Sequence, residues 1–346
     1  MNKPSANQTT PLTPQRIMQF AWGYAVPLAI ETAVRLRVFD EIDAAAGAPV
    51  SVERLREKTG AAPRGLRMLC DLLAAVQLLE KRGGDAYALT PESAAFLVST
   101  KPSFQGGIFK HVSGQLLPKW MKLTDVVRSG KPPSAFNSES EGAAFFEQLV
   151  EDIFPMSYRP AQVLGEHLQL AKSQRPLKVL DIAAGSGVWG IALAQQSPNV
   201  RVTAVDWPRV IPVTRRVAAR FGVGDRFSYI EGDILSADLG RGYDVATLGH
   251  ILHSEGPARS QRLVRRVFEA LAPGGTIAIG EFLADPGRAG PPVAMIFGVN
   301  MLVNTEEGDV FTFDEIAQWL RGAGFTDPRT LDSPGPSPLV LATKPK

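Results

Sequence analysis

The sequence predicts an α/β protein in which a helical N-terminal domain precedes a doubly wound, mostly parallel sheet. Residues 16–170 place their apolar side chains at the spacing of amphipathic helices. From residue 177 onward, short apolar segments alternate with helical ones, and repeated strand–helix units form a parallel sheet. A polar segment that ends in proline, residues 171–176, lies between the two patterns, so we expect domains at residues 14–172 and 173–346.

Length, composition and charge narrow the functional classes. The chain has 346 residues, of which 45% are hydrophobic and 21% charged, as in ordinary globular proteins of two domains. A formal net charge of +2 gives no reason to expect a polyanionic partner. No apolar run is long enough to span a bilayer and the N-terminus has no apolar signal core, so we expect a cytoplasmic protein without a membrane partner. Cys70 is the only cysteine, which excludes an intrachain disulfide, and its apolar neighbours favour a buried helix position.

The elements of the N-terminal domain are predicted to follow a winged-helix order. Residues 16–46 predict a helix that Pro27 kinks or splits, and residues 51–60 predict a second helix between an N-cap serine and a terminal glycine. A third helix is predicted over residues 63–80, and the glycine pair at residues 83–84 predicts a small hairpin after it.

A winged helix in its simplest form binds DNA, but this one lacks the charge to do so. The helix over residues 63–80 would enter the groove, yet its only basic residues are Arg64 and Arg67, near its start. Surfaces that bind phosphates are rich in lysine and arginine. An apolar helix set of this kind more often packs against a second subunit, so we expect a homodimer formed through this domain and no nucleic-acid partner. Residues 104–170 continue the helical pattern.

The second domain is predicted from six strands and the helices between them. The last strand follows a loop rich in glycine and proline and is expected to be an antiparallel edge strand. The predicted strands cover residues 178–182, 200–205, 227–231, 243–249, 275–281 and 339–344. The predicted helices cover residues 188–196, 208–221, 258–271 and 312–322.

A glycine-rich turn after the first of these strands is the strongest functional signal. Residues 178–190 have the sequence KVLDIAAGSGVWG, which predicts a strand, a turn of small residues and the start of a helix. A turn without bulky side chains lets a ligand approach the backbone, and Asp206 at the end of the next strand can hold the hydroxyls of a ribose. The sequence therefore predicts a site for a nucleoside cofactor.

Two kinds of nucleoside cofactor fit this turn. Gly185, Gly187 and Gly190 form a GxGxxG pattern, which favours a nicotinamide dinucleotide. Against it, Trp189 places a bulky ring before the third glycine, where a dinucleotide fold packs closely. Asp181 on the first strand also suits an amino group better than a pyrophosphate.

The tip of the third strand favours an adenine, and from there the residues resemble a known family. Asp233 can accept a hydrogen bond from an adenine amine while Ile234 packs on the ring. Six segments in order resemble the class I S-adenosylmethionine-dependent O-methyltransferases of the plant caffeate, acetylserotonin and bacterial natural-product type. They are residues 181–187, 206–208, 232–233, 249–253, 271–275 and 322–325, and the first half is similar at residues 31–42, 64–80, 87–93 and 155–158.

The resemblance covers residues 14–345 and implies an architecture and a reaction. The C-terminal domain would be a Rossmann-like domain that binds S-adenosylmethionine, and the N-terminal domain a winged-helix-type dimerisation domain. The enzyme would transfer a methyl group to a hydroxyl of a small molecule, for which an aromatic or polyketide-like acceptor is our expectation. No metal ion is expected in the site.

The resemblance also implies roles for single residues around the cofactor. Asp181 and the turn would face the methionine moiety, Asp206 the ribose, and Asp233 the adenine, whereas capping a helix is the alternative role for Asp181 and Asp206. Ser157 or Tyr158 would close the pocket from the helical domain. The expected cofactor-binding residues are Ser157, Tyr158, Asp181, Ala183, Gly185, Gly187, Asp206, Trp207, Gly232, Asp233 and Ile234.

Methyl transfer to a hydroxyl requires an oriented acceptor and a base for its proton. His253 follows the carboxyl end of the fourth strand, and the resemblance places the catalytic histidine of the family there. Glu281, at the tip of the fifth strand, matches an acid that orients this histidine, although a cap or an arginine pair is an equal alternative. A second family acid is absent near Val310; Glu306, Glu307 and Asp309 lie close enough to replace it, and Glu306 is the candidate chosen. The usual His-Asp-Trp is His253-Ser254-Glu255 here, so the tryptophan is also missing.

The acceptor pocket is expected to combine aromatic, apolar and amide side chains. Phe297, Asn300, Met301 and Asn304 fall on one helix face, where two amides suggest hydrogen bonds to a polar acceptor. Core packing is the alternative and suits Met301 best. The expected lining is Trp120, Phe146, Met156, His250, Phe297, Asn300, Met301 and Asn304.

Three other functions remain as alternatives to O-methylation. The same scaffold supports methylation of carbon or nitrogen and other chemistry on S-adenosylmethionine. The missing acid and tryptophan would suit a non-catalytic module. The GxGxxG pattern with Asp206 would suit a nicotinamide-dependent oxidoreductase.

Overall fold

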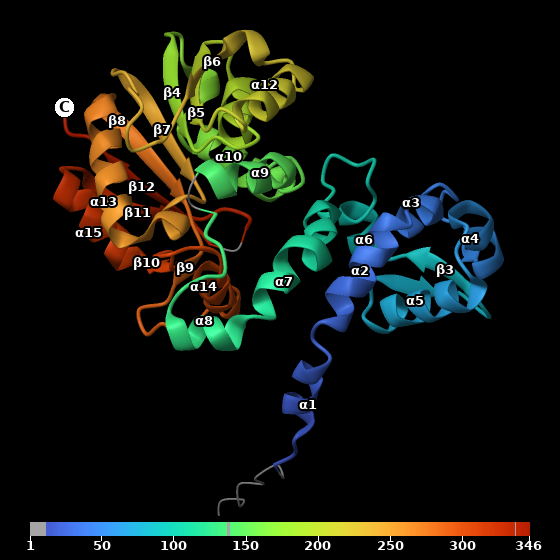
Figure 1. Cartoon of the computed structure of the whole chain (residues 1–346). Helices are drawn as coiled ribbons and strands as arrows, with labels where there is room; N and C mark the ends of the chain where they lie inside the picture. Colours follow the sequence, from blue (N-terminus) through green and yellow to red (C-terminus); the bar gives the residue numbers. More distant parts are fainter. Residues whose placement is uncertain (1–11, 137–138, 336) are drawn as a thin grey trace, which may run out of the picture. The chain divides into compact units, whose positions relative to one another are not determined.

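The computed structural model describes residues 12–136, 139–335 and 337–346. It divides into two compact units, Met1–Ser113 and Gly114–Lys346, each with its own buried core (Figure 1). The boundary predicted from the sequence lies between residues 172 and 173. The division falls earlier because the helices that follow Gly114 share the core of the sheet, as described below.

The first unit consists of helices around a small antiparallel sheet of order β1-β3-β2. Its apolar core contains Phe39, Leu55, Leu66, Leu73 and Tyr87. The elements are α1 (Gln15–Ala21), α2 (Ala25–Arg35), α3 (Val38–Asp43), β1 (Val50–Ser51), α4 (Val52–Thr59), α5 (Pro63–Ala75), β2 (Leu79–Lys81), β3 (Ala86–Leu89), α6 (Pro91–Phe96) and the 3-10 helix η1 (Gly106–His111).

The first predicted helix is divided into three, and the breaks are not at the predicted proline. Helix α1 ends at Ala21, α2 begins at Ala25, and Arg37 separates α2 from α3 with a φ of 59°. Pro27 is the third residue of α2, where the N–H that proline lacks would have had no partner within the helix.

The other predictions for this unit differ from the structure at one helix end and one strand. Ser51 Oγ accepts a hydrogen bond from the Arg54 N–H at 3.2 Å and Gly60 ends the helix with a φ of 70°, which confirms both predicted ends of α4. Helix α5 ends at Ala75 instead of residue 80 because the following residues form β2, which pairs with β3 as the predicted hairpin. Strand β1 is two residues long, too short for a periodic signal, and was not predicted.

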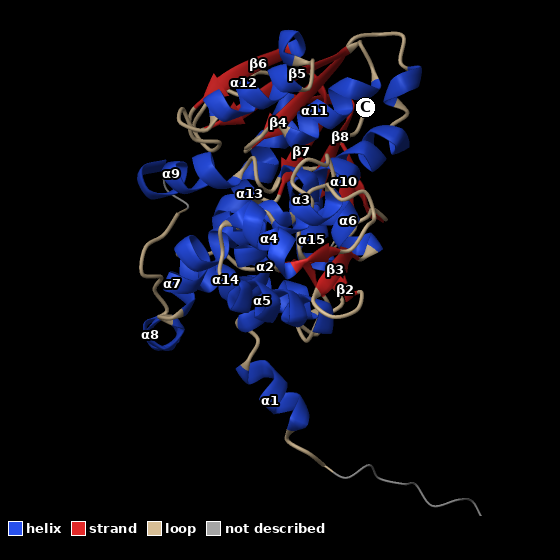
Figure 2. Cartoon of the chain, turned by 90° about the vertical axis from the view of Figure 1, so that its right-hand side faces the viewer, coloured by secondary structure: helices blue, strands red, loops and turns tan. Residues whose placement is uncertain are grey.

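The second unit contains a seven-stranded sheet of order β11-β12-β8-β7-β4-β5-β6 (Figures 1 and 2). The five strands β4 to β8 are parallel, which confirms the predicted doubly wound architecture. The strands are β4 (Leu177–Ile182), β5 (Val200–Asp206), β6 (Phe227–Glu231), β7 (Tyr243–Gly249), β8 (Leu271–Gly280), β11 (Thr326–Leu331) and β12 (Leu339–Thr343), and β9 (Leu283–Ala284) pairs with β10 (Phe311–Thr312) outside this sheet.

The last strand is antiparallel, as predicted, but it is not the edge. Strand β12 lies between β8 and β11, and β11 forms the edge. Strand β11 has the polar sequence TDPRTL, which lacks the apolar pattern from which the other strands are predicted. Its exposed position explains that composition, because an edge strand needs no continuous apolar run.

Helices cover both faces of the sheet and form two separate cores. One core joins α10 and α11 to β4 and β5, and the other joins α13 and α15 to the opposite face. Phe154, Ala161 and Leu164 of α10 belong to the first core, which is why this helix is part of the second unit. The helices are α7 (Leu117–Trp120), α8 (Leu123–Ser129), α9 (Glu139–Leu149), α10 (Phe154–His167), α11 (Val188–Gln196), α12 (Ile211–Arg220), α13 (Leu252–Ala270), α14 (Pro292–Asn304) and α15 (Phe313–Ala323).

Helix α13 begins six residues before its predicted start at residue 258. One turn, from Leu252, precedes a break at Gly256, whose φ is 71°, and Pro257 then begins the longer part. This early turn carries His253 and brings it to the carboxyl end of β7. Among the described helices, none is both long and apolar enough to cross a membrane.

Candidate active site

The turn after β4 has a backbone conformation that favours small residues. Ala183, Gly185 and Gly187 have φ values of 51°, 54° and 77°, in the left-handed region. A Cβ on Gly187 would lie 2.9 Å from Thr214 Cγ2, and the Thr214 hydroxyl donates to the Gly185 carbonyl at 2.7 Å. The turn therefore carries only small side chains, and Thr214 holds its backbone in place.

Asp181 lies beneath this turn and is fully buried. Its Oδ1 accepts from the Thr247 hydroxyl at 2.7 Å, and its Oδ2 accepts from the Gly190 N–H at 3.0 Å. Gly190 is in the first turn of α11, where backbone N–H groups have no partner within the helix. By accepting from Gly190, Asp181 therefore caps α11, which is the alternative role expected for it. Burial outweighs the two hydrogen bonds and raises the pKa of Asp181 to about 7. Thr247 gave no signal in the sequence because it lies within a continuous strand.

Asp206 ends β5 and binds the same turn. Its Oδ2 accepts from the Gly185 N–H and its Oδ1 from the Trp207 N–H, both at 2.7 Å. Burial raises the pKa of Asp206 to about 6, although both hydrogen bonds act to lower it. A carboxylate has about four acceptor positions, so Asp206 can still accept from the hydroxyls of a ribose.

Asp233 follows β6 and lies next to a pair of charges that the sequence analysis missed. The Gly232 N–H donates to the Asp206 carbonyl at 3.0 Å, which joins the two strand tips. Asp233 Oδ2 is 3.6 Å from an Arg259 nitrogen, and Arg259 Nε donates to Glu255 Oε2 at 2.6 Å. Glu255 is buried, which raises its pKa. The spacing of four residues between Glu255 and Arg259 on a helix could have indicated the pair.

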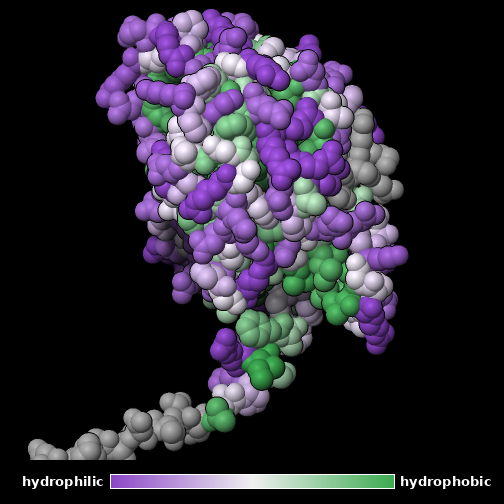
Figure 3. Space-filling model, turned by 90° about the vertical axis from the view of Figure 1, so that its left-hand side faces the viewer, coloured by the Kyte–Doolittle hydropathy of each residue, from purple (hydrophilic) through white to green (hydrophobic). Residues whose placement is uncertain are grey.

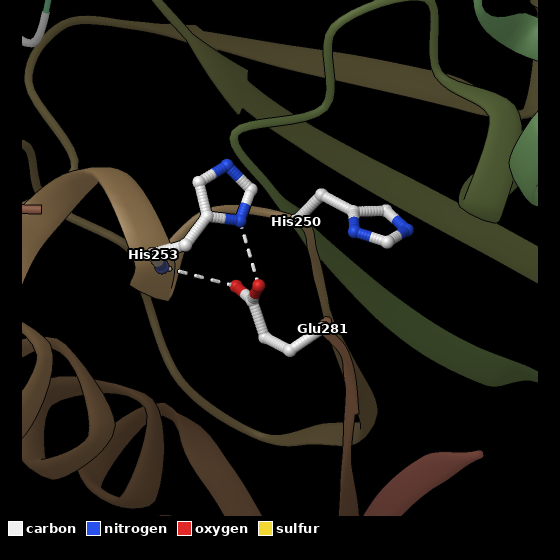
Figure 4. A group of neighbouring side chains, drawn as sticks. All are labelled: His250, His253 and Glu281. Atoms are coloured by element: carbon white, nitrogen blue, oxygen red, sulfur yellow. Dashed lines mark hydrogen bonds and ion pairs between the residues drawn. The ribbon is translucent and has the colours of Figure 1, made fainter. Parts of the chain in front are cut away.

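His253 and Glu281 form a buried hydrogen-bonded pair (Figure 4). The distance from His253 Nδ1 to Glu281 Oε2 is 2.6 Å, and the backbone N–H of His253 donates to Oε1 at 3.2 Å. Burial alone would raise the pKa of Glu281, but the charge of His253 and its hydrogen bonds outweigh burial and lower it. Glu281 thus holds the histidine and does not pair with an arginine. In Figure 4, Nε2 lies on the side of the ring away from Glu281.

His250 is the second histidine of this group and is held in a strained conformation. Its φ is 61°, and its N–H donates to the Gly280 carbonyl at 2.8 Å. Burial lowers its pKa to about 4, so the imidazole is neutral at pH 7. Among the described residues, its buried Nδ1 has no hydrogen-bond partner. One nitrogen or oxygen from each of His250, His253 and Glu281 lies within 4.8 Å of the others, so these side chains could also hold a metal ion.

Two phenylalanines form an aromatic wall beside the histidines. Phe297 of α14 contacts the His253 ring edge-on at 4.8 Å between centroids and stacks on Phe282 at 4.1 Å. Phe282 also lies 5.3 Å from the His250 ring. Phe297 was expected here, whereas Phe282 was missed although it directly follows Glu281. The wall is suited to a flat aromatic molecule.

The two predicted pocket amides bind protein groups. Asn300 Oδ1 accepts from Trp120 Nε1 at 3.0 Å and from Asn304 Nδ2 at 3.1 Å. Asn304 is 1% exposed, and its carbonyl accepts from the Phe136 N–H at 3.0 Å. The expected Trp120, Asn300 and Asn304 therefore lie together, but they form a structural chain between α7 and α14.

A second aromatic group connects α9 to the cofactor side. Phe146 contacts Trp207 at 6.1 Å between ring centroids, and it packs edge-on against Phe136 and Phe145. Val150, just after α9, lies 3.2 Å from where a Cβ of Gly185 would be. The end of α9 therefore lies against the glycine-rich turn, and the expected role of Phe146 in the acceptor pocket stays a prediction.

Several expected site residues lie elsewhere. The Tyr158 hydroxyl donates to Gln195 at 2.6 Å, near the end of α11 opposite the turn, and Ser157 is buried in α10 beside Tyr158. Met156 is 39% exposed on α10, and Met301 is 2% exposed in the core, which is the packing alternative. Glu306 is an exposed residue of the loop after α14. Ile234 is buried in the second core next to Asp233.

The residues at this edge of the sheet fit a nucleoside cofactor that carries a positive charge. A bare turn at the end of β4 lies beside carboxylates at the ends of β5 and β6, which is where doubly wound sheets bind ligands. The neutral imidazole of His250 and the carboxylates of Asp206 and Asp233 suit a cation better than a pyrophosphate.

Comparisons with known proteins place these features in a family. The family model described as an O-methyltransferase domain matches residues 120–326, and that of the O-methyltransferase dimerisation domain matches residues 18–99. The tetracenomycin polyketide synthesis 8-O-methyl transferase of Streptomyces glaucescens is 29% identical over 96% of this chain and 97% of its own. The 3-hydroxy-5-methyl-1-naphthoate 3-O-methyltransferase of Streptomyces sahachiroi is 30% identical over 96% of this chain and 95% of its own. The structure of human N-acetylserotonin methyltransferase in complex with S-adenosylmethionine superposes with a TM-score of 0.84 at 23% identity, over 99% of this chain and all of the other.

Proposed function

Because this chain belongs to the family of S-adenosylmethionine-dependent O-methyltransferases, we propose that it methylates a hydroxyl of a small aromatic or polyketide-like molecule with His253 as the general base. It is a methyltransferase of the natural-product and acetylserotonin type, and its cofactor is S-adenosylmethionine. The hydrogen-bonded pair of His253 and Glu281 at the carboxyl edge of the sheet carries the proposal.

The residues at the strand tips are assigned to the cofactor. The turn at Ala183–Gly187 would hold the methionine end, Asp206 the ribose and Asp233 the adenine. When bound, S-adenosylmethionine supplies a methyl group attached to a positively charged sulfur, which is the electrophile of the reaction. Asp181, whose Oδ2 accepts from the Gly190 N–H at the start of α11, would support the methionine end together with the turn.

His253 is assigned to the acceptor proton. With the Nδ1–H donated to the Glu281 carboxylate, Nε2 retains a lone pair and can accept a proton from a hydroxyl. A phenol has a pKa of about 10 and is mostly protonated at neutral pH, so removal of its proton lowers the barrier. The Glu281 carboxylate then stabilises the imidazolium that forms, as the acid of a catalytic triad does.

The acceptor class is proposed from the aromatic wall and from the relatives. Phe282 and Phe297 stack on each other beside His253, and aromatic rings there would favour a flat aromatic acceptor. Two relatives carry names that point to the same chemistry, a polyketide and a hydroxynaphthoate. Methylation of carbon or nitrogen remains an outcome of the product analysis.

A homodimer is proposed through the N-terminal domain. The match to a dimerisation domain supports it. Apolar side chains on and after α1 are also widely exposed, with Ile17 at 73%, Phe20 at 72% and Trp22 at 66%. Green areas in Figure 3 mark hydrophobic residues on this part of the chain. Burial of such residues against a second copy would remove them from water.

The test is product analysis with labelled cofactor. The protein is incubated with methyl-labelled S-adenosylmethionine and hydroxynaphthoates or polyketide phenols, and mass spectrometry locates the label. We expect an O-methyl product, loss of turnover by roughly 100-fold or more in His253→Ala, and unchanged binding of S-adenosylhomocysteine in calorimetry. A chelator should leave the rate unchanged. A labelled carbon or nitrogen, or full activity of His253→Ala, would refute the proposal.

A further inference from the structure

Two glycines face each other at the ends of β7 and β8, the strands that lead to His253 and Glu281. Gly249 is the last residue of β7 and Gly280 the last of β8, and they are register partners. His250 follows the first glycine and Glu281 the second. Glycine within a strand weakens it unless something approaches the backbone closely.

The indole of Trp189 fills the space above both glycines. A Cβ on Gly249 would lie 1.9 Å from Trp189 Nε1, and a Cβ on Gly280 would lie 2.8 Å from Cζ2. Side chains at these positions would therefore overlap a rigid ring that is only 4% exposed. The three residues form one packed unit in which the ring replaces the side chains that the two strands lack.

This unit connects the cofactor turn with the strand ends that lead to the histidines and Glu281. Trp189 is the second residue of α11, two positions after Gly187 of the cofactor turn. The Gly280 carbonyl accepts from the N–H of His250 at 2.8 Å, so the same backbone that packs against the indole also fixes His250. A shift of the ring would move both strand ends.

We propose that Trp189 is a positioning residue for methyl transfer: its indole, packed on Gly249 and Gly280, fixes the strand ends so that Glu281 holds His253. The inference rests on the proposed role of His253 as base. Misplacement of a reacting group by about 1 Å can lower turnover 100-fold, so small movements of this support matter.

The first experiment separates positioning from core packing. In Trp189→Leu we expect kcat to fall roughly 10- to 100-fold while KM for the cofactor changes by less than about threefold. Leu193→Ala is the matched control, since Leu193 lies one helical turn further along α11 and is equally buried in the same core. It should lose a similar amount of thermal stability and keep kcat within about threefold. Trp189→Phe gives the same comparison with a milder change if the leucine variant does not fold.

The second experiment does not depend on methyl transfer. A proton shared between an imidazole nitrogen and a carboxylate at 2.6 Å gives a low-field NMR signal, assigned by its loss in Glu281→Gln. This signal should be shifted or lost in Trp189→Leu and kept in Leu193→Ala. If the wild-type protein methylates nothing, the proposed function fails, whereas this measurement still tests the role of Trp189.

A double variant completes the test. Gly280→Ala alone should lower kcat, because the new Cβ overlaps the ring. In the Trp189→Leu background the same change should be neutral or restore activity, because space is then free. Loss of activity that is the same in both backgrounds, or a Trp189→Leu variant with normal kcat and NMR signal, would overturn the proposal.

Discussion

Replacing Glu281 by glutamine tests the central pair without changing its shape. Glutamine keeps an oxygen that can accept from His253 Nδ1, now 2.6 Å from Oε2, but it removes the negative charge. A hydrogen bond to a charged group contributes about 1.5–3 kcal/mol, and each 1.36 kcal/mol corresponds to tenfold in rate. Because the charge is needed only when the imidazole is protonated, the loss falls on the transition state. We therefore expect kcat to fall roughly 10- to 150-fold.

The assay is the initial rate of labelled methyl transfer to the acceptor identified by product analysis, at saturating cofactor. Glu306→Gln is the matched comparison, because Glu306 is the other acid proposed from the sequence and is exposed in the structure. We expect its rate to stay within about twofold. The reasoning would be refuted if Glu281→Gln kept the wild-type rate, or if Glu306→Gln lost more activity than Glu281→Gln.

Three further predictions concern the cofactor side. Gly190→Ala should lower the free energy of unfolding by about 1–3 kcal/mol in chemical denaturation, because the new Cβ would lie 2.6 Å from Val202 Cγ1. Gly65→Ala, in α5 with open space around it, should be neutral or stabilising by up to about 1 kcal/mol, and equal effects would contradict the packing argument. The affinity for S-adenosylhomocysteine should rise about tenfold from pH 5 to pH 7 as Asp206, with its pKa of about 6, ionises and accepts more strongly from the ribose; calorimetry should find no such rise in Asp206→Asn. The pKa of Asp181, about 7, lies above its unfolded value of about 3.9, so the folded state loses stability as the pH rises between these values. In the wild-type protein the free energy of unfolding should fall between pH 5 and pH 8, and Asp181→Asn should make this fall smaller by about 2–3 kcal/mol. If the variant showed the same pH dependence of unfolding as the wild type, Asp181 would not be its cause.

The sequence predicted the parts of the fold that repeat and missed those that depend on distant partners. Strands β4 to β8 were found because buried parallel strands are continuously apolar, whereas β11 is a polar edge strand. The break before α2 lies at residues 22–24, which include the helix-disfavouring Gly23, and not at Pro27. Short β1 exists only because β3 pairs with it.

The candidate site was predicted better in position than in detail. His253 and Glu281 were assigned from their places at strand ends, and the structure joins them at 2.6 Å. The partners of Asp181 could not be predicted, because Thr247 lies 66 residues away in sequence. Nothing in the sequence around Asn300 and Asn304 indicates that the indole N–H of Trp120, from another helix, donates to Asn300.

The way the glycine-rich turn is tied down has a consequence for the thermodynamics of cofactor binding. Thr214 and Asp206 bind the two sides of Gly185, and Asp181 holds the helix that follows. Because the turn is already held in one conformation, a ligand that binds there does not have to order a mobile loop. Little of its binding free energy is therefore lost to the conformational entropy of the chain. The turn keeps the same conformation when the product leaves, so the next cofactor molecule binds a site that is already formed.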